Sequence, residues 1–258
     1  MPFHFVDFDT AAANPLDAEE ALLAQAASGG PVAHLWQAPV SLVVPRSYQR
    51  HATLDAARAE FARRGCPVWL RLSGGGLVPQ GPGILNLSLA YPVRGAMGTL
   101  ADAVYLHLCE ILAEALRSVD VQTHWQAVEG SFCDGRFNLA WGAADDPRKI
   151  AGTAQYWRRV PDGQMPAQAA GASSALYVVL AHAVLLVDAD PVEINRRAND
   201  FEAMLGSGRH YEADKVVSVA QALARQGTTV RAGLPERVDE ALRAAVAAAP
   251  PTPGSGDF

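Results

Sequence analysis

The sequence predicts an α+β domain with a mixed or antiparallel sheet flanked by helices, and three observations support this fold class. Segments with strand-like and helical spacing of apolar residues are mixed along the chain, without the strict alternation that builds a parallel sheet. Half of the 258 residues are hydrophobic, which suffices for a substantial core. No repeat and no interdomain linker is found, so we expect one domain over residues 1–248 and a disordered tail over 249–258.

The first half of the chain is expected to contain five strands and three helices. Alternating or β-branched runs predict strands at Phe3–Phe8, Ala33–Trp36, Ser41–Val44, Pro67–Leu72 and Leu85–Tyr91. Acidic residues favour a first helix that opens at Asn14-Pro15-Leu16-Asp17 and runs to about Ala27. The other two helices are predicted from helical spacing at Thr53–Arg64 and Thr99–Arg117.

The second half is predicted to begin with a hairpin and to end with helices. Strands at Phe137–Trp141 and Lys149–Gln155 flank a turn, and this hairpin would hold Lys149 on a short rim close to Cys133. A loose connection follows at 163–172, and then Leu176–Val187 forms a strand pair or one long strand. The three last helices are expected at Pro191–Leu205, Ala213–Arg225 and Pro235–Ala248.

Composition argues against several classes of protein. A net charge of −6 and a pI near 5.6 disfavour a nucleic-acid surface. The N-terminus lacks a targeting pattern and no apolar run reaches the length of a membrane span, so we expect a cytoplasmic protein. The three cysteines have neither a disulfide framework nor metal-ligand spacing, so we expect no metal and no tightly bound cofactor.

The first candidate for chemistry is a glycine-rich loop after a predicted strand, Arg71-Leu72-Ser73-Gly74-Gly75-Gly76. Successive glycines let the backbone approach a ligand closely, and this suits a phosphate, a carboxylate or an acyl-adenylate. Arg71 would then hold an anionic oxygen. The alternative is a flexible turn, which an isolated triple glycine more often is. No Gly-Lys-Ser/Thr follows, so the loop is not a Walker A motif.

The other candidates are Lys149 and Cys133. Only two of the 21 basic residues are lysines, so a retained lysine suggests a need for its compact charge or tunable pKa. The alternative for Lys149 is an ordinary surface charge. Cys133 has polar neighbours, whereas Cys66 and Cys109 have apolar ones; a lone cysteine is nevertheless more often a small buried hydrophobe. His182, within an apolar run, is expected to be a core histidine rather than a base.

Together, the glycine loop and the later segment Arg148-Lys149-Ile150-Ala151-Gly152-Thr153-Ala154-Gln155 resemble the two signatures of the lipoate–protein ligase A and octanoyltransferase family. That family shares the catalytic fold of biotin protein ligases. Asp17–Leu23 resembles its first helix, Phe137–Leu139 resembles the strand before its lysine, and His182 falls where the family has a histidine. The resemblance covers most of residues 3–225.

The resemblance implies an enzyme that joins an octanoyl or lipoyl carboxyl group to one lysine of a carrier domain. Such carriers are the lipoyl domains of 2-oxoacid dehydrogenases and the glycine-cleavage carrier protein; acyl-carrier protein is a possible donor. Lys149 would polarise the carbonyl group. The residues implied to bind the acyl group or adenylate are Arg71, Ser73, Gly74, Gly75, Gly76, Val78, Asn86, Asn138, Gly152, Ala154 and His182.

Two mechanisms occur in the family, and the resemblance favours the one that uses a cysteine. Cys133 stands where one branch of acyltransferases has its thioester-forming cysteine, and Lys149 and Arg136 would help to ionise it. No residues remain after 248 for the accessory domain of many ligases. Gln80-Gly81 replaces the family's His-Asp pair, and 143–146 lengthen the lysine loop.

Three other functions stay open at this point. An ATP-dependent ligase would use free lipoate or octanoate with ATP and Mg, and would leave Cys133 as a bystander. A non-catalytic descendant would bind lipoate or an adenylate without transferring it. A biotin ligase is less favoured, because it would leave Cys133 unexplained.

Overall fold

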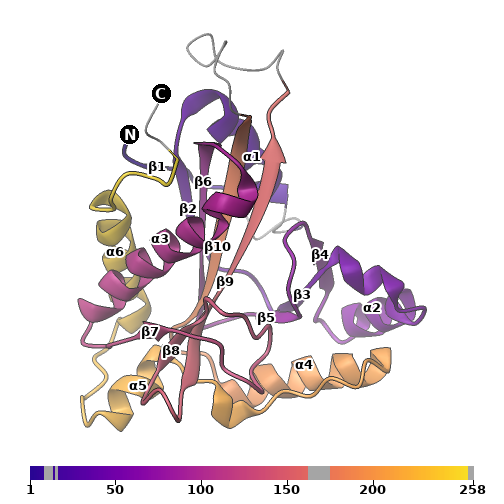
Figure 1. Cartoon of the computed structure of the whole chain (residues 1–258). Helices are drawn as coiled ribbons and strands as arrows, with labels where there is room; N and C mark the ends of the chain where they lie inside the picture. The colour runs from indigo at the N-terminus through magenta and orange to yellow at the C-terminus, as the bar shows by residue number, and fades with distance from the viewer. Residues whose placement is uncertain (9–13, 15–16, 162–174, 255–258) are drawn as a thin grey trace.

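A seven-stranded mixed sheet forms the centre of the computed structural model, which describes residues 1–8, 14, 17–161 and 175–254 (Figure 1). Its outermost strand β1 is parallel to β2, and the other neighbours are antiparallel. In spatial order the strands are β1 (His4–Phe5), β2 (Val32–Trp36), β6 (Ile84–Arg94), β10 (Leu176–Leu186), β9 (Arg148–Arg159), β8 (Leu139–Trp141) and β7 (His124–Trp125).

Helices cover both faces of this sheet. On one face, α3 (Met97–Arg117), α5 (Val219–Arg225) and α6 (Leu234–Ala247) contribute to the largest hydrophobic cluster, and α1 (Asp17–Gly29) packs on the other face. Strand β10 therefore needs apolar residues on both sides: Val179 and Ala181 face the first cluster, whereas Val178 and Leu180 face α1. This explains its nearly continuous apolar run.

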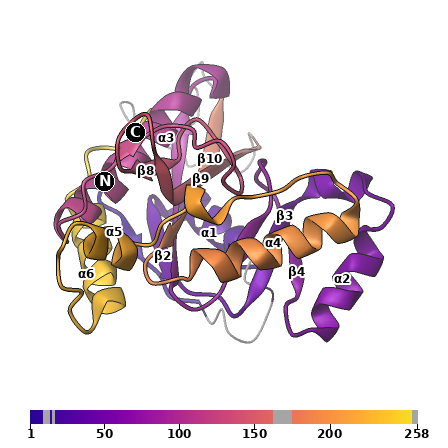
Figure 2. The same ribbon diagram turned by 90° about the horizontal axis from the view of Figure 1, so that it is seen from below.

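A smaller three-stranded sheet stands beside the first and carries the glycine-rich loop. Its order is β4 (Val68–Arg71), β3 (Ser41–Pro45) and β5 (Val78–Gln80). A short 3-10 helix, η1 (Arg46–Arg50), follows β3. Helices α2 (Leu54–Arg63) and α4 (Pro191–Leu205) enclose a second core with this sheet, and Figure 2 shows α4 running beneath it. The glycine loop joins β4 to β5, next to the large sheet.

The predicted α+β class and most elements are confirmed, but several boundaries were wrong. The first strand is only His4–Phe5, although the Val6 N–H still donates to the Ala33 carbonyl and Val6 and Phe8 pack against the cluster that contains Leu22 and Leu23 of α1. The expected helix Ala213–Arg225 is a 3-10 turn, η4 (Ala213–Lys215), and then α5, since Ser218 forms a capping box with Gln221. Leu176–Leu186 is one strand, and the expected connection 163–172 lies outside the described residues.

The expected disordered tail is ordered as far as the structure describes it. Thr252 is buried, the Pro250 carbonyl accepts a hydrogen bond from His107 Nε2, and the Gly254 carbonyl accepts one from the Arg94 N–H. This stretch therefore contacts the rest of the fold.

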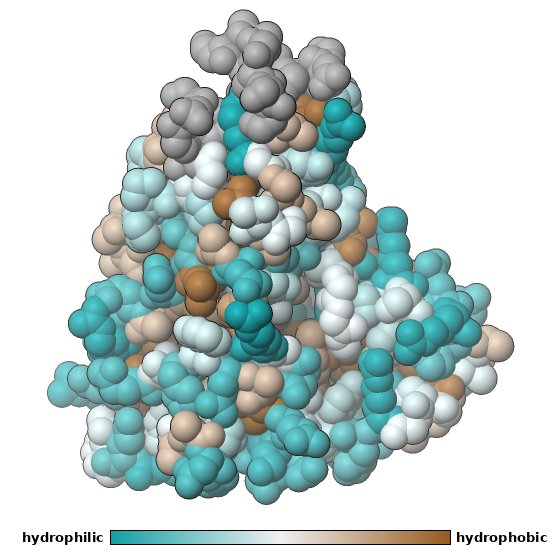
Figure 3. Space-filling view, viewed as in Figure 1, coloured by the Kyte–Doolittle hydropathy of each residue, from teal (hydrophilic) through white to brown (hydrophobic). Residues whose placement is uncertain are grey.

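No helix within the described ranges combines the length and apolarity needed to cross a bilayer. On the face shown in Figure 3, hydrophobic side chains form small separate patches among polar ones.

Candidate active site

A pocket with about 490 Å³ of empty space, mouth included, lies where the two sheets meet α1 and the loop at Phe132 and Cys133. The pocket is lined by Glu19, Trp36, Val43, Arg71, Val78, Gln80, Phe132, Cys133, Lys149, Gly152, Thr153, Ala154, His182 and Val184.

Cys133 stands in a backbone conformation that side chains rarely adopt. Its φ is 46°, in the left-handed region where a residue other than glycine is usually strained. The turn places Sγ 3.3 Å from the Gly76 amide nitrogen and 3.7 Å from Arg71 Nη2. Asn138 Nδ2 lies 3.4 Å from the Cys133 carbonyl oxygen and steadies the turn. The predicted thiol is thus held against the predicted glycine loop.

Lys149 is buried, not displayed on a rim as the sequence suggested. It pairs with Ala140 across β8 and β9 and is only 1% exposed. Its Nζ donates to the carbonyl oxygens of Phe132 at 2.6 Å and Cys133 at 3.0 Å, and lies 4.7 Å from the centre of the Phe132 ring. Burial lowers the pKa of Lys149 to about 8, although the Cys133 and Asp134 charges oppose this shift. Lys149 therefore reaches both the thiol loop and the pocket.

The charges around Cys133 favour its thiolate. Burial alone would raise the pKa of this thiol, but the Lys149 and Arg71 charges and the Gly76 N–H together lower it below the ordinary value. Arg136, the neighbour that the sequence suggested as a second cation, instead forms an exposed ion pair with Asp102 at 3.0 Å. Arg71 takes the role that was expected of Arg136.

Arg71 holds the glycine loop in shape. Its guanidinium donates to the carbonyl oxygens of Val43 at 3.3 Å, Gly74 at 2.8 Å and Gly76 at 2.7 Å. Glycine is required at 75, because a Cβ there would lie 2.8 Å from the Cys133 sulfur and φ is +101°. At 76 a Cβ would meet the Cys133 backbone at 3.3 Å. The triple glycine thus lets the loop pack onto the thiol.

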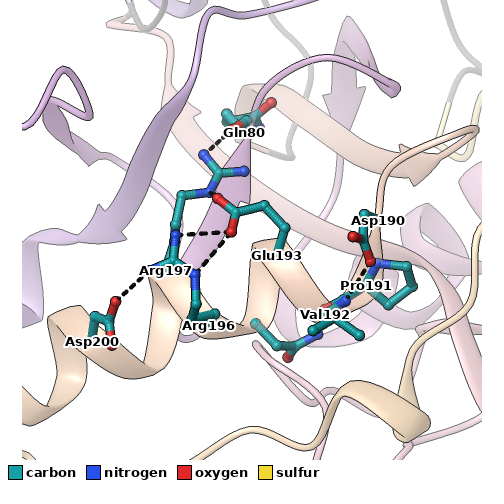
Figure 4. Close-up of polar contacts among 9 residues, drawn as sticks. Gln80, Asp190, Pro191, Val192, Glu193, Arg196, Arg197 and Asp200 are labelled. Carbon is teal, nitrogen blue, oxygen red and sulfur yellow. Dashed lines mark hydrogen bonds and ion pairs between the residues drawn. The ribbon is translucent and has the colours of Figure 1, made fainter.

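Gln80 is fixed from two sides. Its side-chain amide exchanges two hydrogen bonds of 2.9 Å with Asn86. Figure 4 shows Arg197 reaching from α4 to the Gln80 carbonyl at 3.1 Å, while Glu193 pairs with Arg197 at 3.1 Å. In this way α4 anchors β5. Asn86 supports the pocket through Gln80 and does not itself line it.

The remaining predicted residues divide between two places. Val78, Gly152, Ala154 and His182 line the pocket, whereas Ser73 and Gly74 line an adjoining groove near the start of α3. Among the residues described, no three His, Cys, Asp or Glu side chains gather as metal ligands would.

His182, which the sequence suggested as a core histidine, instead lines the pocket as a neutral imidazole. Its Nδ1 lies 2.9 Å from Ser88 Oγ, and its partly exposed ring lines the pocket. Burial lowers the pKa of His182 to about 3, with the Arg71 charge acting in the same direction. Motif reasoning missed seven lining residues, because strand pairing and packing bring them to the pocket: Glu19, Trp36, Val43, Gln80, Phe132, Thr153 and Val184.

Comparison with known sequences gives one family match and several relatives. Residues 11–164 match the family model described as the lipoyl protein ligase A/B catalytic domain. An uncharacterized Cupriavidus necator protein is 60% identical over 97% of this chain and 99% of its own length. An octanoyl-GcvH:protein N-octanoyltransferase of Kyrpidia tusciae is 36% identical over 68% of this chain, which spans 57% of that relative.

Two further comparisons involve proteins named as ligases. A candidate lipoate-protein ligase A of Aeropyrum pernix is 32% identical over 69% of this chain and 54% of its own length. A bipartite lipoate protein ligase of Thermoplasma acidophilum superposes on 95% of this chain and 82% of its own, with a TM-score of 0.57 and 16% identity. A lipoate-protein ligase A structure with bound ATP superposes on 95% of this chain and 94% of its own, with a TM-score of 0.54 and 16% identity.

Proposed function

The chain is an enzyme of the lipoyl protein ligase A/B catalytic-domain family, and from this premise we propose that it transfers an octanoyl or lipoyl group through a thioester on Cys133. The acceptor is a lysine of a lipoyl carrier domain. Kyrpidia tusciae octanoyl-GcvH:protein N-octanoyltransferase is the relative whose name matches such an activity.

The surroundings of Cys133 are the main support for this mechanism. Its sulfur lies 3.3 Å from the Gly76 amide nitrogen, and the charges of Lys149 and Arg71 lower the pKa of the thiol. Few structural roles would require a cysteine at positive φ beside two cations. A thiol with a lowered pKa that lines a pocket is the arrangement needed for nucleophilic catalysis.

In the first half-reaction, the Cys133 thiolate attacks the carbonyl carbon of a donor thioester. The new carbon–sulfur bond forms, the donor's carbon–sulfur bond breaks, and the departing thiolate takes a proton from water. The Gly76 N–H and the cations Arg71 and Lys149 surround the place where negative charge develops on the carbonyl oxygen. Acyl-carrier protein is one donor of this class.

In the second half-reaction, the neutral amine of the carrier lysine attacks the thioester carbonyl. The amide bond forms, the bond to Cys133 breaks, and the surplus proton on nitrogen passes to water. Cys133 leaves again as a thiolate, and the same two cations stabilise it. The sum is the transfer of one acyl group from sulfur to nitrogen.

ATP-dependent ligation is the second candidate, favoured by the 32% identity to a candidate lipoate-protein ligase A. In that reaction free lipoate or octanoate reacts with ATP and Mg to form an acyl-adenylate, and Lys149 polarises the acyl carbonyl. Cys133 then plays no part. The thiolate-stabilising contacts are unnecessary for this route, which is why we favour the transferase.

Intact-mass measurement separates the two mechanisms. The wild type, Cys133→Ala and the control Cys109→Ala are each mixed with octanoyl-acyl-carrier protein in the absence of ATP. We expect a hydroxylamine-sensitive octanoyl adduct on the wild type and on Cys109→Ala only. Equal carrier modification by wild type and Cys133→Ala with lipoate and ATP would establish the ligase instead. Lipoate binding without any transfer would indicate a non-catalytic homologue.

A further inference from the structure

Arg209 is an exposed cation beside the reaction centre, and the transfer mechanism gives it no role. It lies in the loop between α4 and η4, where the described part of the chain offers it no ion-pair partner. A Cβ on Gly76 would lie 3.8 Å from Arg209 Nη1 and 3.3 Å from the Cys133 Cα, so both crowd the same point of the glycine loop. Gly76 is also the residue whose N–H donates to the Cys133 sulfur. The guanidinium therefore stands just outside the place where the acyl thioester forms.

A buried carboxylate holds this arginine in place through a tyrosine. Glu202 of α4 is 0% exposed, and its Oε1 accepts hydrogen bonds from the Tyr48 hydroxyl at 2.5 Å and the Tyr211 hydroxyl at 2.7 Å. The Tyr48 oxygen in turn accepts one from Arg209 Nη1 at 2.7 Å, and the guanidinium carbon lies 5.5 Å from the centre of the Tyr48 ring. Arg209 is thus fixed at one nitrogen, whereas its Nε and Nη2 form no hydrogen bond with the residues that the structure describes.

The loop that carries Arg209 is anchored to α4 on both sides of this residue. The Ser207 N–H donates to the Glu202 carbonyl at 3.1 Å, and Ser207 Oγ accepts from the Arg209 N–H at 3.2 Å. On the other side, the Asn199 side chain exchanges hydrogen bonds of 2.7 and 2.8 Å with the Tyr211 backbone. Ordering a long side chain is one of the costs of binding, and these contacts meet it before a ligand arrives. The fold therefore preorganises an exposed cation for an anionic ligand.

The closeness of Arg209 to Cys133 indicates which substrate supplies that anion. A lysine side chain extends only about 6 Å from Cα to Nζ. When the carrier lysine attacks the Cys133 thioester, the residues that flank this lysine on the carrier therefore come close to Arg209. The lysine approaches as a cation and meets the charges of Arg71 and Lys149 around the sulfur. A carboxylate beside the lysine would offset this repulsion and would find its own partner in Arg209.

We propose that Arg209 recognises a carboxylate that flanks the target lysine of the acceptor carrier domain. This inference rests on the proposed acyl-transfer function and specifies how its second substrate is selected. The carboxylate accepts hydrogen bonds from Nε and Nη2, the edge of the guanidinium that suits a carboxylate, while Nη1 stays with Tyr48. Arg209 thereby acts on the second half-reaction and not on the loading of Cys133.

Kinetics of the two half-reactions test this assignment. Enzyme loaded from octanoyl-acyl-carrier protein is mixed with a lipoyl carrier domain, and amide formation is followed by intact mass for the wild type, Arg209→Gln and Arg209→Lys. We expect Arg209→Gln to lower kcat/KM for the carrier about tenfold, mainly through KM, and to weaken its dependence on salt. Arg209→Lys should restore part of the loss, because it keeps the charge without the planar fork. Loading of Cys133 should not change, nor should transfer to Nα-acetyl-lysine N-methylamide, an amine without a carboxylate.

A double-mutant cycle identifies the carboxylate on the carrier. Each Asp or Glu within about 10 Å of the target lysine is changed in turn to Asn or Gln, and each variant carrier is offered to the wild type and to Arg209→Gln. One of these changes should slow transfer by the wild type but have no further effect on Arg209→Gln. Tyr48→Phe, which removes the hydroxyl that holds Nη1, should raise KM for the unmodified carrier less than Arg209→Gln does.

Arg225→Gln is the matched control, because Arg225 is another exposed arginine and lies in the last turn of α5. It should leave the kinetics with the carrier unchanged. Equal kcat/KM for wild type and Arg209→Gln, or an equal loss with the small amine, would overturn the role of Arg209. Slower loading of Cys133 in Arg209→Gln would also overturn it and would assign the arginine to the acyl donor.

Failure of the proposed function would look different, since the wild type itself would then form no Cys133 adduct. The same variants would in that case be compared with lipoate, ATP and Mg as the source of the acyl group. KM for the carrier still reports on Arg209 there, and an unchanged KM in Arg209→Gln would again reject the carboxylate contact.

Discussion

Cys133, which is partly exposed, and Cys109, which is buried, are both free thiols, but their surroundings drive their ionisation in opposite directions. Cys109 lies within α3, is 2% exposed and donates to the Phe137 carbonyl at 3.4 Å. Burial raises its pKa to about 12, and the charge of Glu110 adds to this shift. At Cys133 burial acts in the same direction, yet Lys149, Arg71 and the Gly76 N–H outweigh it. Converging positive groups, not exposure alone, make a cysteine reactive.

Differential labelling should give the largest contrast between these thiols. In native protein treated with iodoacetamide at neutral pH, we expect Cys133 to react at least about a thousandfold faster than Cys109, because only thiolates are strong nucleophiles. Cys66, whose pKa burial also raises, should behave like Cys109. Peptide mass spectrometry over time measures the three rates, and comparable rates would contradict the assigned electrostatics. Denatured protein is the control in which the difference should vanish.

Removing the Lys149 charge should make the Cys133 thiol less reactive, as Cys109 is. Lys149→Met keeps a long apolar side chain and deletes the charge that does most to lower the pKa of the Cys133 thiol. We expect iodoacetamide labelling of Cys133 to slow about tenfold and acyl transfer to fall about a hundredfold. Lys215→Met, which changes the other lysine of the chain, is the control. Unchanged labelling of Cys133 in Lys149→Met would show that Arg71 and the Gly76 N–H suffice to lower the pKa of the thiol.

The residues around Cys133 differ in how far the sequence predicted their roles. The two motifs predicted Lys149 and the glycine loop, and polarity of neighbouring residues singled out Cys133. Arg136 forms an exposed ion pair with Asp102, so adjacency in sequence suggested the wrong cation. Arg71, 62 positions away in sequence, is the effective one. Glu19 and Trp36 reach the pocket only through packing of α1 and pairing of β2, which no local pattern encodes.

Prediction of the fold has the same limit, because local sequence patterns do not encode tertiary contacts. Strands such as β10 were predictable because long apolar runs must be buried on both faces. The break before α5 could have been read from the Ser218 to Gln221 capping signal, which the broader helical pattern obscured. The end of the chain looked disordered by composition, yet its contact with His107 is a tertiary interaction beyond the reach of composition.

Crowding the Cys133 thiol should slow acyl transfer less than removing the Lys149 charge does. Gly75→Ala puts a Cβ at a φ of +101° and 2.8 Å from the Cys133 sulfur, so the loop or the thiol must shift. We expect acyl transfer to fall about tenfold, because the Arg71 and Gly76 contacts to sulfur lengthen. Gly98→Ala is the control, since a Cβ there meets nothing within 4 Å. Full activity of Gly75→Ala would mean that these contacts do not matter.

The pH dependence of acyl transfer should reflect the ionisation of both Cys133 and Lys149. Activity is expected to rise with pH as the Cys133 thiol, with its lowered pKa, ionises, and to fall as Lys149 loses its proton at about 8. Lys149→Arg keeps a cation at high pH and should remove the alkaline fall, although at a lower maximal rate. Rates of carrier modification across the pH range test this. An alkaline fall that persists in Lys149→Arg would assign it to another group.

Glu19 is the intermediate case between the two cysteines, because a single cation opposes its burial. Burial raises its pKa to about 7, and the Arg71 charge lowers it only in part. Between the ordinary value of 4.5 and about 7 the folded protein binds more protons than the unfolded chain, so stability falls as pH rises across that window. This pKa shift corresponds to a change of about 3 kcal/mol at most in the free energy of unfolding.

Glu19→Gln removes the ionisation and should therefore flatten this fall. Urea unfolding of wild type and variant at about pH 5 and about pH 8 measures it, and the variant should gain stability relative to the wild type only at the higher pH. Asp17→Asn, which alters another exposed carboxyl in the first turn of α1, should leave the difference unchanged. Equal pH dependence in wild type and Glu19→Gln would mean that Arg71 stabilises the Glu19 carboxylate as fully as the paired cations stabilise the Cys133 thiolate. One cation would then be enough to offset the effect of burial, and the number of nearby cations would not explain why Glu19 and Cys133 differ.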